Sequence, residues 1–420
     1  MNPTRREILQ GAAASLSALA IPSNVHAAGD DLLKVALVGC GGRGTGAASQ
    51  ALRADPNLKL VALADAYGDR LEKSLKTLQG DAEISGKVDV PSERRFVGFD
   101  AYKGAIDAAD VVLLCEPPHF RPRHFKAAIE AGKHVFAEKP VAVDGPGTRS
   151  MIESCEAARK KGLSVVSGLC LRYSNAFREA VRRIHDGAIG EVVAVQANDY
   201  RSGRWARPRQ PGQTDMDYQM RNWYNFTWLS GDFNVEQHVH FLDVAAWVMK
   251  DVYPVKAVGM GGRQVLVEPE YGNIYDHFSV VYEYASGVRL YSNTRHHRGC
   301  KNEMATHVFG SKGRAFISEG RITFTGPDAW EHRGRDNNFY QTEHDELFAS
   351  IRKGKPINNG DYMNKSSLLA IQGRMSAYTG QEIGWDQALA SKEDLSPPKY
   401  DWAVALPDPP VAIPGKTRFV

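Results

Sequence analysis

The sequence predicts an α/β fold in which a doubly wound parallel sheet precedes a second, α+β domain with an open, mostly antiparallel sheet. Three observations support this prediction. After residue 31, short and continuously apolar stretches alternate with helical segments, which is typical of a parallel sheet covered on both faces. The first of these stretches ends in a glycine-rich turn that opens a helix. After Gly190, long strands follow one another through tight turns with few helices between them.

The first domain is expected over residues 32–170. Its buried strands are predicted in the apolar stretches LKVALVGC, LKLVALAD, ADVVLLCEP and HVFAEKP. Helices are expected at Thr45–Ala54 and over HFKAAIEAGK, where Gly132 provides the stop, and one more helix and strand fill Thr148–Leu171. Short connections with right-handed crossovers between such units give a doubly wound sheet.

The second domain is expected over residues 171–395. Its strands are predicted in EVVAVQANDY, VYPVKAVGMGG, HFSVVYEYASGVRLYSNTRHH and THVFGSKGRAFISEGRITFTG. A helix near Val235–Met249 is expected to cover one face of this sheet, and two more helices are predicted at Tyr340–Arg352 and Asn364–Tyr378. Residues 396–420 are rich in proline and lack periodicity, so we expect an irregular tail that runs over the surface.

Composition excludes several classes of protein. With 43% apolar and 24% charged residues, the 420-residue chain has the composition of a globular protein that can bury substantial cores. A formal net charge of +3 gives no broad basic surface for nucleic acid, and no apolar run after Ile21 approaches membrane-spanning length. We therefore expect neither a nucleic-acid partner nor a membrane anchor. Five cysteines without a CxxC motif argue against a disulfide framework or a zinc site.

Residues 1–27 have the pattern of an export signal. Arg5 and Arg6 precede a mildly apolar run from Gly11 to Ile21, and Val25-His26-Ala27 offers a small-residue cleavage site. Paired arginines are typical of the twin-arginine (Tat) route, by which folded proteins leave the cytoplasm. A periplasmic or secreted location is therefore expected. The alternative is a cytoplasmic protein whose first residues form a frayed, Ala-rich helix.

The turn from Gly39 to Gly44, with the sequence GCGGRG, matches the GxGxxG fingerprint of a Rossmann dinucleotide-binding domain. Its context fits, because the turn follows a strand and opens a helix, and Asp65 ends the next strand 21 residues after Gly44. In this fingerprint Gly39 allows the tight turn, Gly41 lets a pyrophosphate approach the backbone, and Gly44 lets helix and strand pack closely. The cofactor contacts predicted from this turn are Gly39, Gly41, Gly42, Arg43 and Gly44.

Asp65 points to NAD as the cofactor. Its carboxylate can accept hydrogen bonds from the adenosine ribose hydroxyls and would repel a 2′-phosphate. Arg43 and Arg70 leave NADP possible, since either could bind that phosphate. The alternative for the whole motif is a glycine-rich turn without a ligand.

Taken together, four motifs resemble the Gfo/Idh/MocA oxidoreductases: GCGGRG at Gly39–Gly44, AGKHVFAEKP at Ala131–Pro140, LRY at Leu171–Tyr173 and HVHFLD at His238–Asp243. The resemblance implies that the second domain holds the substrate and builds a homo-oligomer. It also implies that Lys139, in the EKP turn, lies beside the reacting carbinol. Further cofactor contacts are expected from Glu116, Pro117, Glu138, Lys139 and Arg172, and Arg121 stands where many members have a histidine.

GDFNVEQHVHFLDVAAWVM places Glu236, His240 and Asp243 at i, i+4 and i+7, within one stripe of an α-helix. A histidine beside a carboxylate suits proton transfer near neutral pH. The match to the family's Asp-x-x-x-His motif predicts His240 as catalytic, together with Lys139, and Glu236 as the acid that orients them. A solvated surface helix is the alternative. A metal held by Glu236, His238 and His240 is a minor one, because His-x-His shares a face only in a strand, and we expect no metal.

Substrate contacts are expected mainly from the stretch between Arg201 and Trp228, where aromatic and basic residues gather. Aromatic rings can stack on sugars, and arginines can bind hydroxyls or a carboxylate. Packing between subunits is the alternative, and Arg295–Arg298 at a strand end is a further candidate region. The predicted substrate contacts are Tyr173, Arg201, Trp205, Trp223 and His240.

These predictions describe an oxidoreductase that transfers hydride between a tightly bound nicotinamide cofactor and a sugar, polyol or sugar derivative, similar to inositol and glucose dehydrogenases. A cofactor that stays bound would reconcile the dinucleotide fingerprint with an export signal, because free NAD is scarce outside the cytoplasm. Two alternatives remain open. One is a redox-neutral, NAD-dependent glycoside hydrolase, and the other is a non-catalytic sensor or binding protein.

Overall fold

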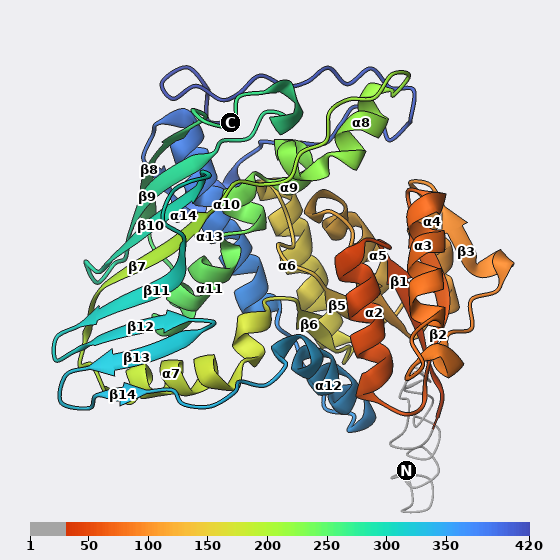
Figure 1. Ribbon diagram of the computed structural model, residues 1–420, viewed down its shortest axis with the longest axis horizontal. Helices are drawn as coiled ribbons and strands as arrows, with labels where there is room; N and C mark the ends of the chain where they lie inside the picture. Colours follow the sequence, from red (N-terminus) through yellow and green to blue (C-terminus); the bar gives the residue numbers. More distant parts are fainter. Residues whose placement is uncertain (1–30) are drawn as a thin grey trace, which may run out of the picture.

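The computed structural model describes residues 31–420 (Figure 1), so the predicted export signal lies outside the described residues. Two sheets organise this part of the chain, one parallel and one mostly antiparallel, with helices packed between and around them. Across residues 31–420, no helix combines the length and the apolar character needed to cross a membrane.

The first sheet has six strands in the order β3-β2-β1-β4-β5-β6, and all its pairings are parallel. This confirms the predicted doubly wound sheet. Because β2 lies on one side of β1 and β4 on the other, the carboxyl ends of β1 and β4 form the switch point at which such sheets bind ligands. The elements are β1 (Leu33–Val38), α2 (Gly42–Ala54), β2 (Leu58–Asp65), α3 (Gly68–Gln79), β3 (Arg95–Val97), α4 (Ala101–Ala108), β4 (Val111–Leu114), α5 (Arg121–Glu130), β5 (His134–Ala137), α6 (Gly145–Lys160) and β6 (Val165–Ser167).

A helix from far along the chain completes this first unit. The helix α12 (Phe339–Arg352) buries Leu347, Phe348 and Ile351 in the same apolar cluster as strand β1 and helix α2. Its apolar periodicity predicted the helix, over Tyr340–Arg352, but placed it in the second domain. The structure shows it packed on α2 and β6 instead (Figure 1).

The second sheet has nine strands in the order β14-β13-β12-β11-β7-β10-β9-β8-β15. Only the β7–β10 pairing is parallel among the described pairs, which confirms the mostly antiparallel prediction. Helices α11 (Val239–Val248) and α13 (Gly360–Thr379) pack on the inner face of this sheet, and no helix of residues 31–420 covers the opposite face (Figure 1). The strands are β7 (Val192–Arg201), β8 (Lys256–Gly262), β9 (His277–Glu283), β10 (Arg289–His296), β11 (Glu303–Gly310), β12 (Arg314–Ser318), β13 (Arg321–Thr325), β14 (Trp330–Glu331) and β15 (Ile383–Gly384).

The helices of the second unit differ in one respect from expectation. The helix predicted at Val235–Met249 is divided into α10 (Phe233–Glu236) and α11 (Val239–Val248), and short helices occupy the 201–230 connection. The remaining α-helices are α7 (Asn175–His185), α8 (Asp215–Arg221), α9 (Thr227–Ser230), α13 (Gly360–Thr379) and α14 (Trp385–Ala390).

Residues 391–420 form no helix or strand, but their apolar side chains are docked. Tyr400, Trp402 and Leu406 pack on a cluster that joins residues of both units. The Gln219 side-chain amide donates to the Leu406 carbonyl at 2.8 Å, which fixes the tail beside α8. The tail therefore crosses the junction between the two units, along the top of the view in Figure 1.

Candidate active site

The glycine turn between β1 and α2 has the geometry of a phosphate cradle. Gly39 has φ +91°, and a Cβ there would lie 2.4 Å from the Glu116 backbone nitrogen. A Cβ on Gly44 would lie 1.9 Å from the Gly39 carbonyl oxygen, so helix and turn are in close contact. Around Gly41, in contrast, no atom lies within 4 Å of such a Cβ. Open space beside the first turn of α2 fits a pyrophosphate, which the amides of a helix N-terminus bind.

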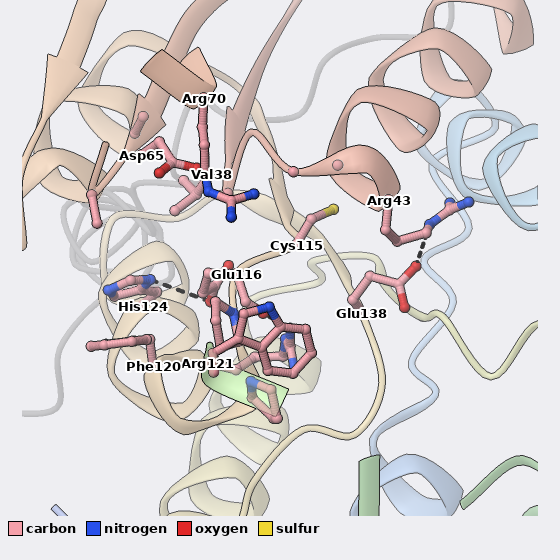
Figure 2. A pocket seen from close by; sticks show the side chains of 18 of the residues that line it. Val38, Arg43, Asp65, Arg70, Cys115, Glu116, Phe120, Arg121, His124 and Glu138 are labelled. Carbon is pink, nitrogen blue, oxygen red and sulfur yellow. Dashed lines mark hydrogen bonds and ion pairs between the residues drawn. The ribbon is translucent and has the colours of Figure 1, made fainter. Parts of the chain in front are cut away.

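Asp65, at the end of β2, is oriented by backbone amides. Its two carboxylate oxygens accept hydrogen bonds from Cys40 N at 2.7 Å and from Tyr67 N at 2.9 Å. Burial raises the pKa of this carboxyl, and the two amides oppose that rise by stabilising the charged form. Arg70 lies beside Asp65, and both residues line the pocket next to the glycine turn (Figure 2). An oriented carboxylate here fits the ribose hydroxyls of NAD.

Arg43 points away from Asp65. Its guanidinium Nε donates to Glu138 Oε1 at 2.6 Å (Figure 2), and Nη2 lies 3.3 Å from Glu343 Oε1. The same group lies over the Tyr340 ring, 4.8 Å from its centroid. Of the two arginines that left NADP possible, only Arg70 therefore lies beside Asp65. Glu138 in turn is held at the end of β5, next to the glycine turn.

The segment after β4 forms another side of this pocket. Glu116 and Pro117, the predicted cofactor contacts of this segment, line the same pocket as Asp65 and the glycine turn. Glu116 Oε1 lies 3.3 Å from His124 Nδ1 (Figure 2), and the His124 ring stacks on Tyr102 with centroids 4.0 Å apart. Arg121, where many family members have histidine, is buried and donates hydrogen bonds to the carbonyls of Pro140 and Glu116. It thereby braces the ends of β4 and β5 against each other.

Lys139, Glu236 and His240 meet in this pocket. Lys139 Nζ donates to the Glu236 carbonyl oxygen at 2.7 Å and to Glu236 Oε1 at 3.1 Å. Both side chains are largely buried, at 14% and 11% exposed. Burial and the neighbouring Lys139 cation hold the pKa of His240 well below its usual range. The imidazole of His240 is therefore neutral at neutral pH, beside the Lys139–Glu236 pair.

The break between α10 and α11 changes the predicted acid–histidine–acid stripe. Both Gln237 N and His238 N donate to the Phe233 carbonyl, at 2.9 and 3.1 Å, which widens the turn at this point. Wide turns of this kind are frequent at functional sites. Glu236 and His240 still face the pocket, but Asp243 does not. Its carboxylate instead pairs with Arg172 Nε at 2.8 Å and accepts the Ser366 hydroxyl at 2.8 Å.

Arg172 and Tyr173 do not line the pocket, contrary to expectation. Arg172 is buried between Asp243 and Asp251, with NH2 2.6 Å from Asp251 Oδ1. The Tyr173 hydroxyl donates to Asn359 Oδ1 at 2.8 Å in the core beneath α12. The LRY motif, a short 3-10 turn (η4, Cys170–Tyr173), thus joins the two units and does not line this pocket.

The predicted substrate residues divide into two groups. Trp223 and His240 line the pocket, whereas Arg201 and Trp205 do not. Arg201 Nε is held by Asp199 Oδ1 at 2.5 Å, and Trp205 is 43% exposed and packs against the edge of Trp223. Trp205 thus supports the wall from outside.

The structure does not bring the three residues of the minor metal hypothesis together in this pocket. His238 is fully buried, its Nε2 lies 2.8 Å from the Ser292 hydroxyl, and it does not line the pocket with Glu236 and His240. Within residues 31–420, one group of three potential metal ligands is found, and it lies elsewhere, at Asp276, His277 and His297.

Several pocket residues carried no signal in the sequence. Tyr67, Phe99 and Phe120 form an aromatic wall, and the tail packs behind it, with the Trp402 ring 4.5 Å from Phe99 and 5.1 Å from Tyr67. Isolated aromatic residues in loops are common, so only the fold reveals that these lie together. Other pocket residues missed by the sequence are Met220, Gln237 and Tyr340.

Comparison with known proteins identifies both units. A family model described as "Oxidoreductase family, NAD-binding Rossmann fold" matches residues 33–168, and one described as "GFO/IDH/MocA C-terminal domain" matches residues 177–316. Inositol 2-dehydrogenase of Rhizobium meliloti is 25% identical over 307 residues, 72% of this chain and 81% of that protein. Myo-inositol 2-dehydrogenase of Thermotoga maritima is 26% identical over 217 residues, 51% of this chain and 58% of that protein.

Solved structures share the fold. The crystal structure of aldose–aldose oxidoreductase from Caulobacter crescentus, complexed with glycerol, matches with a TM-score of 0.65 at 20% sequence identity. The match covers 84% of this chain and 99% of that one, so both units and their arrangement are shared.

Proposed function

Because this chain belongs to the Gfo/Idh/MocA family of oxidoreductases, it is an NAD-dependent oxidoreductase of CH–OH groups, and we propose that its own substrate is a sugar, a polyol or a sugar derivative. One observation carries this proposal. Lys139 and His240 face the same pocket as the glycine turn and Asp65, so hydroxyl chemistry and cofactor binding converge on one cavity. The relatives named as inositol dehydrogenases fit this substrate class.

The residues present fit NAD. Asp65 would hold the adenosine ribose, and the first turn of α2, with the open space at Gly41, would hold the pyrophosphate. The nicotinamide of bound NAD⁺ supplies the acceptor for hydride from the substrate carbon.

His240 is the proposed general base. Its depressed pKa keeps the imidazole neutral at pH 7, so a ring nitrogen can accept the proton of the reacting hydroxyl. Lys139 has three N–H groups, of which two bind Glu236. The third is available to the same substrate oxygen and would stabilise the charge that develops on it. Glu236 thereby orients the ammonium group.

We also propose that the cofactor stays bound between turnovers. The aromatic wall at Tyr67 and Phe99 is backed by Trp402, and the Tyr67 hydroxyl donates to the Asp217 carbonyl at 3.2 Å. Arg221 adds a contact across the same junction, 3.9 Å from the Tyr67 ring centroid. Widening this side of the pocket would therefore require the tail and α8 to move. A retained cofactor suits a closed cycle in which one substrate reduces it and a second reoxidises it.

The retention proposal has a direct test. The protein is purified without added cofactor and denatured, and the released nucleotide is measured. We expect close to one NAD per chain. Fewer than about a tenth of sites filled, with a dissociation constant weaker than about 10 μM, would contradict retention.

A second assay compares aryl glycosides with free sugars and polyols. Glycoside cleavage without net formation of NADH would favour the redox-neutral glycoside hydrolase.

Two further proposals concern location and assembly. Arg5-Arg6 and the apolar run after them support export by the Tat route. The test compares the export of a reporter protein fused to residues 1–30 with that of the same fusion in which both arginines are changed to lysine.

The outer face of the nine-stranded sheet supports a homo-oligomer. There the exposed Val258 and Tyr291 both lie beside Val281 in the strand pairing, and light scattering would give the assembly size.

A further inference from the structure

Three potential metal ligands meet at one end of the nine-stranded sheet. Asp276 precedes β9, His277 is its first residue, and His297 directly follows β10. The pairing of His277 with Arg295, and the hydrogen bond from His296 N to the Asp276 carbonyl at 2.9 Å, bring the two strand ends together. One ligating atom from each of the three side chains lies within 4.8 Å of the others. This cluster does not line the active-site pocket.

The distances fit a metal ion. Asp276 Oδ1 lies 2.7 Å from His277 Nδ1 and 3.2 Å from His297 Nε2. Ligands around a tetrahedral Zn²⁺ with bonds of about 2.0–2.1 Å are separated by roughly 3.3 Å. The His297 contact already has this length, and the His277 contact would have to lengthen by about 0.6 Å. We propose that Asp276, His277 and His297 bind a divalent transition-metal ion, for which Zn²⁺ is the best match.

The carboxylate is already held in position. Asp276 Oδ2 accepts three backbone N–H groups, from Gln264 at 2.8 Å, Val265 at 2.6 Å and Leu266 at 2.9 Å. This leaves Oδ1 directed at the two imidazoles. A ligand oriented by such second contacts loses less freedom when it binds a metal. Asp276 is fully buried, whereas His277 and His297 are 37% and 16% exposed, so an ion and its remaining water ligands can reach the site.

The chemistry of the donor set selects the class of ion. Two neutral imidazoles and one carboxylate suit Zn²⁺ and its first-row neighbours, whereas Ca²⁺ and Mg²⁺ require mainly oxygen ligands. Three protein ligands leave a position for water.

The ion would connect loop 263–274 to the end of β10. That loop supports the pocket wall, because the Glu270 carbonyl accepts Asn222 Nδ2 at 2.7 Å and Asn273 N donates to the Asn225 carbonyl at 3.1 Å. Asn222 and Asn225 flank Trp223, which lines the active site. The proposed role is therefore to stabilise the substrate side of the pocket from behind, without taking part in the reaction.

The experiment uses the full chain after EDTA treatment and desalting. ZnCl₂ is titrated calorimetrically, and thermal unfolding is recorded with and without Zn²⁺. We expect one saturable site per chain and a higher unfolding temperature with Zn²⁺. His277→Ala and His297→Ala should each weaken binding at least about tenfold. His307→Ala is the matched control, because His307 also pairs with a carboxylate, Glu303, at 3.0 Å, and lies in another strand.

Each outcome decides the proposal. A site lost in both test variants and kept in His307→Ala supports it, provided that the metal-free variants unfold at the temperature of the metal-free parent. Absence of saturable binding in the parent overturns it, as does binding that is unchanged in both test variants. If the metal-free variants are destabilised, Co²⁺ spectra of His277→Gln and His297→Gln decide, and an unchanged tetrahedral spectrum overturns the proposal.

Discussion

Trp402→Ala should accelerate cofactor release. The indole packs on Phe99 and Tyr67, with ring centroids 4.5 and 5.1 Å away, and both of these rings line the cofactor pocket. An aromatic pair contributes about 0.5–1.5 kcal/mol beyond its buried area, so losing two pairs weakens tail docking by about 1–3 kcal/mol. If the tail must undock before the cofactor leaves, release becomes about 5- to 150-fold faster, because 1.4 kcal/mol corresponds to a factor of ten.

The assay follows the fluorescence of bound NADH after mixing with excess unlabelled NAD⁺. Trp330→Ala is the matched control, because this half-buried tryptophan packs on Phe324 at the far edge of the second sheet, 5.5 Å between centroids. Its release rate should equal that of the parent. A release rate of Trp402→Ala within twofold of the parent, in a protein that is still folded, would refute the argument that the tail controls release.

NAD should bind more tightly than NADP in a direct titration, and Asp65→Ala should reduce the difference between the two affinities. A parent protein that binds NADP more tightly would overturn this interpretation of Asp65. Lys139→Ala and His240→Ala should each lower turnover by about 10²-fold or more, while the His240 variant still binds NAD. Near-normal turnover in both variants would show that neither side chain is catalytic. Burial lowers the pKa of His119, His238 and His296 to about 4, 3 and 4, so they are neutral when folded and take up protons on unfolding. The free energy of unfolding should therefore fall by several kcal/mol as the pH drops from about 6.5 to 4, and a flat urea-unfolding profile over this range would contradict it.

The parts of the fold that the sequence predicted have a local signal. Continuous apolar runs such as LKVALV and LKLVALAD are typical of strands that a parallel sheet buries on both faces, and the structure has them as β1 and β2. For α12, periodicity predicted the helix but not the sheet on which it packs. Which sheet an amphipathic helix covers depends on contacts with residues distant in sequence, here those of α2.

In the candidate site, too, features with a local sequence signal were predicted and contacts between distant residues were not. The roles expected of Gly39, Gly44 and Asp65 follow from turn geometry, and the structure places these residues as expected. Arg172 was expected to contact the cofactor because it belongs to the LRY motif that carries the family resemblance. A 3-10 turn directs its side chain to Asp243 and Asp251 instead, where a buried arginine needs its charge balanced. The Trp402 contact follows no periodic pattern, so the sequence did not predict it.

A CH–OH substrate is expected to reduce the bound cofactor at the Lys139–His240 site. The direct measurement adds sugars and cyclic polyols, myo-inositol included, to the protein with its NAD⁺ bound, and records absorbance at 340 nm over a single turnover. We expect at least one compound to reduce the cofactor in the parent. Reduction should slow by about 10²-fold or more in Lys139→Ala. No reduction by any compound tested in protein shown to hold NAD⁺, or an equal rate in the Lys139 variant, would contradict the account.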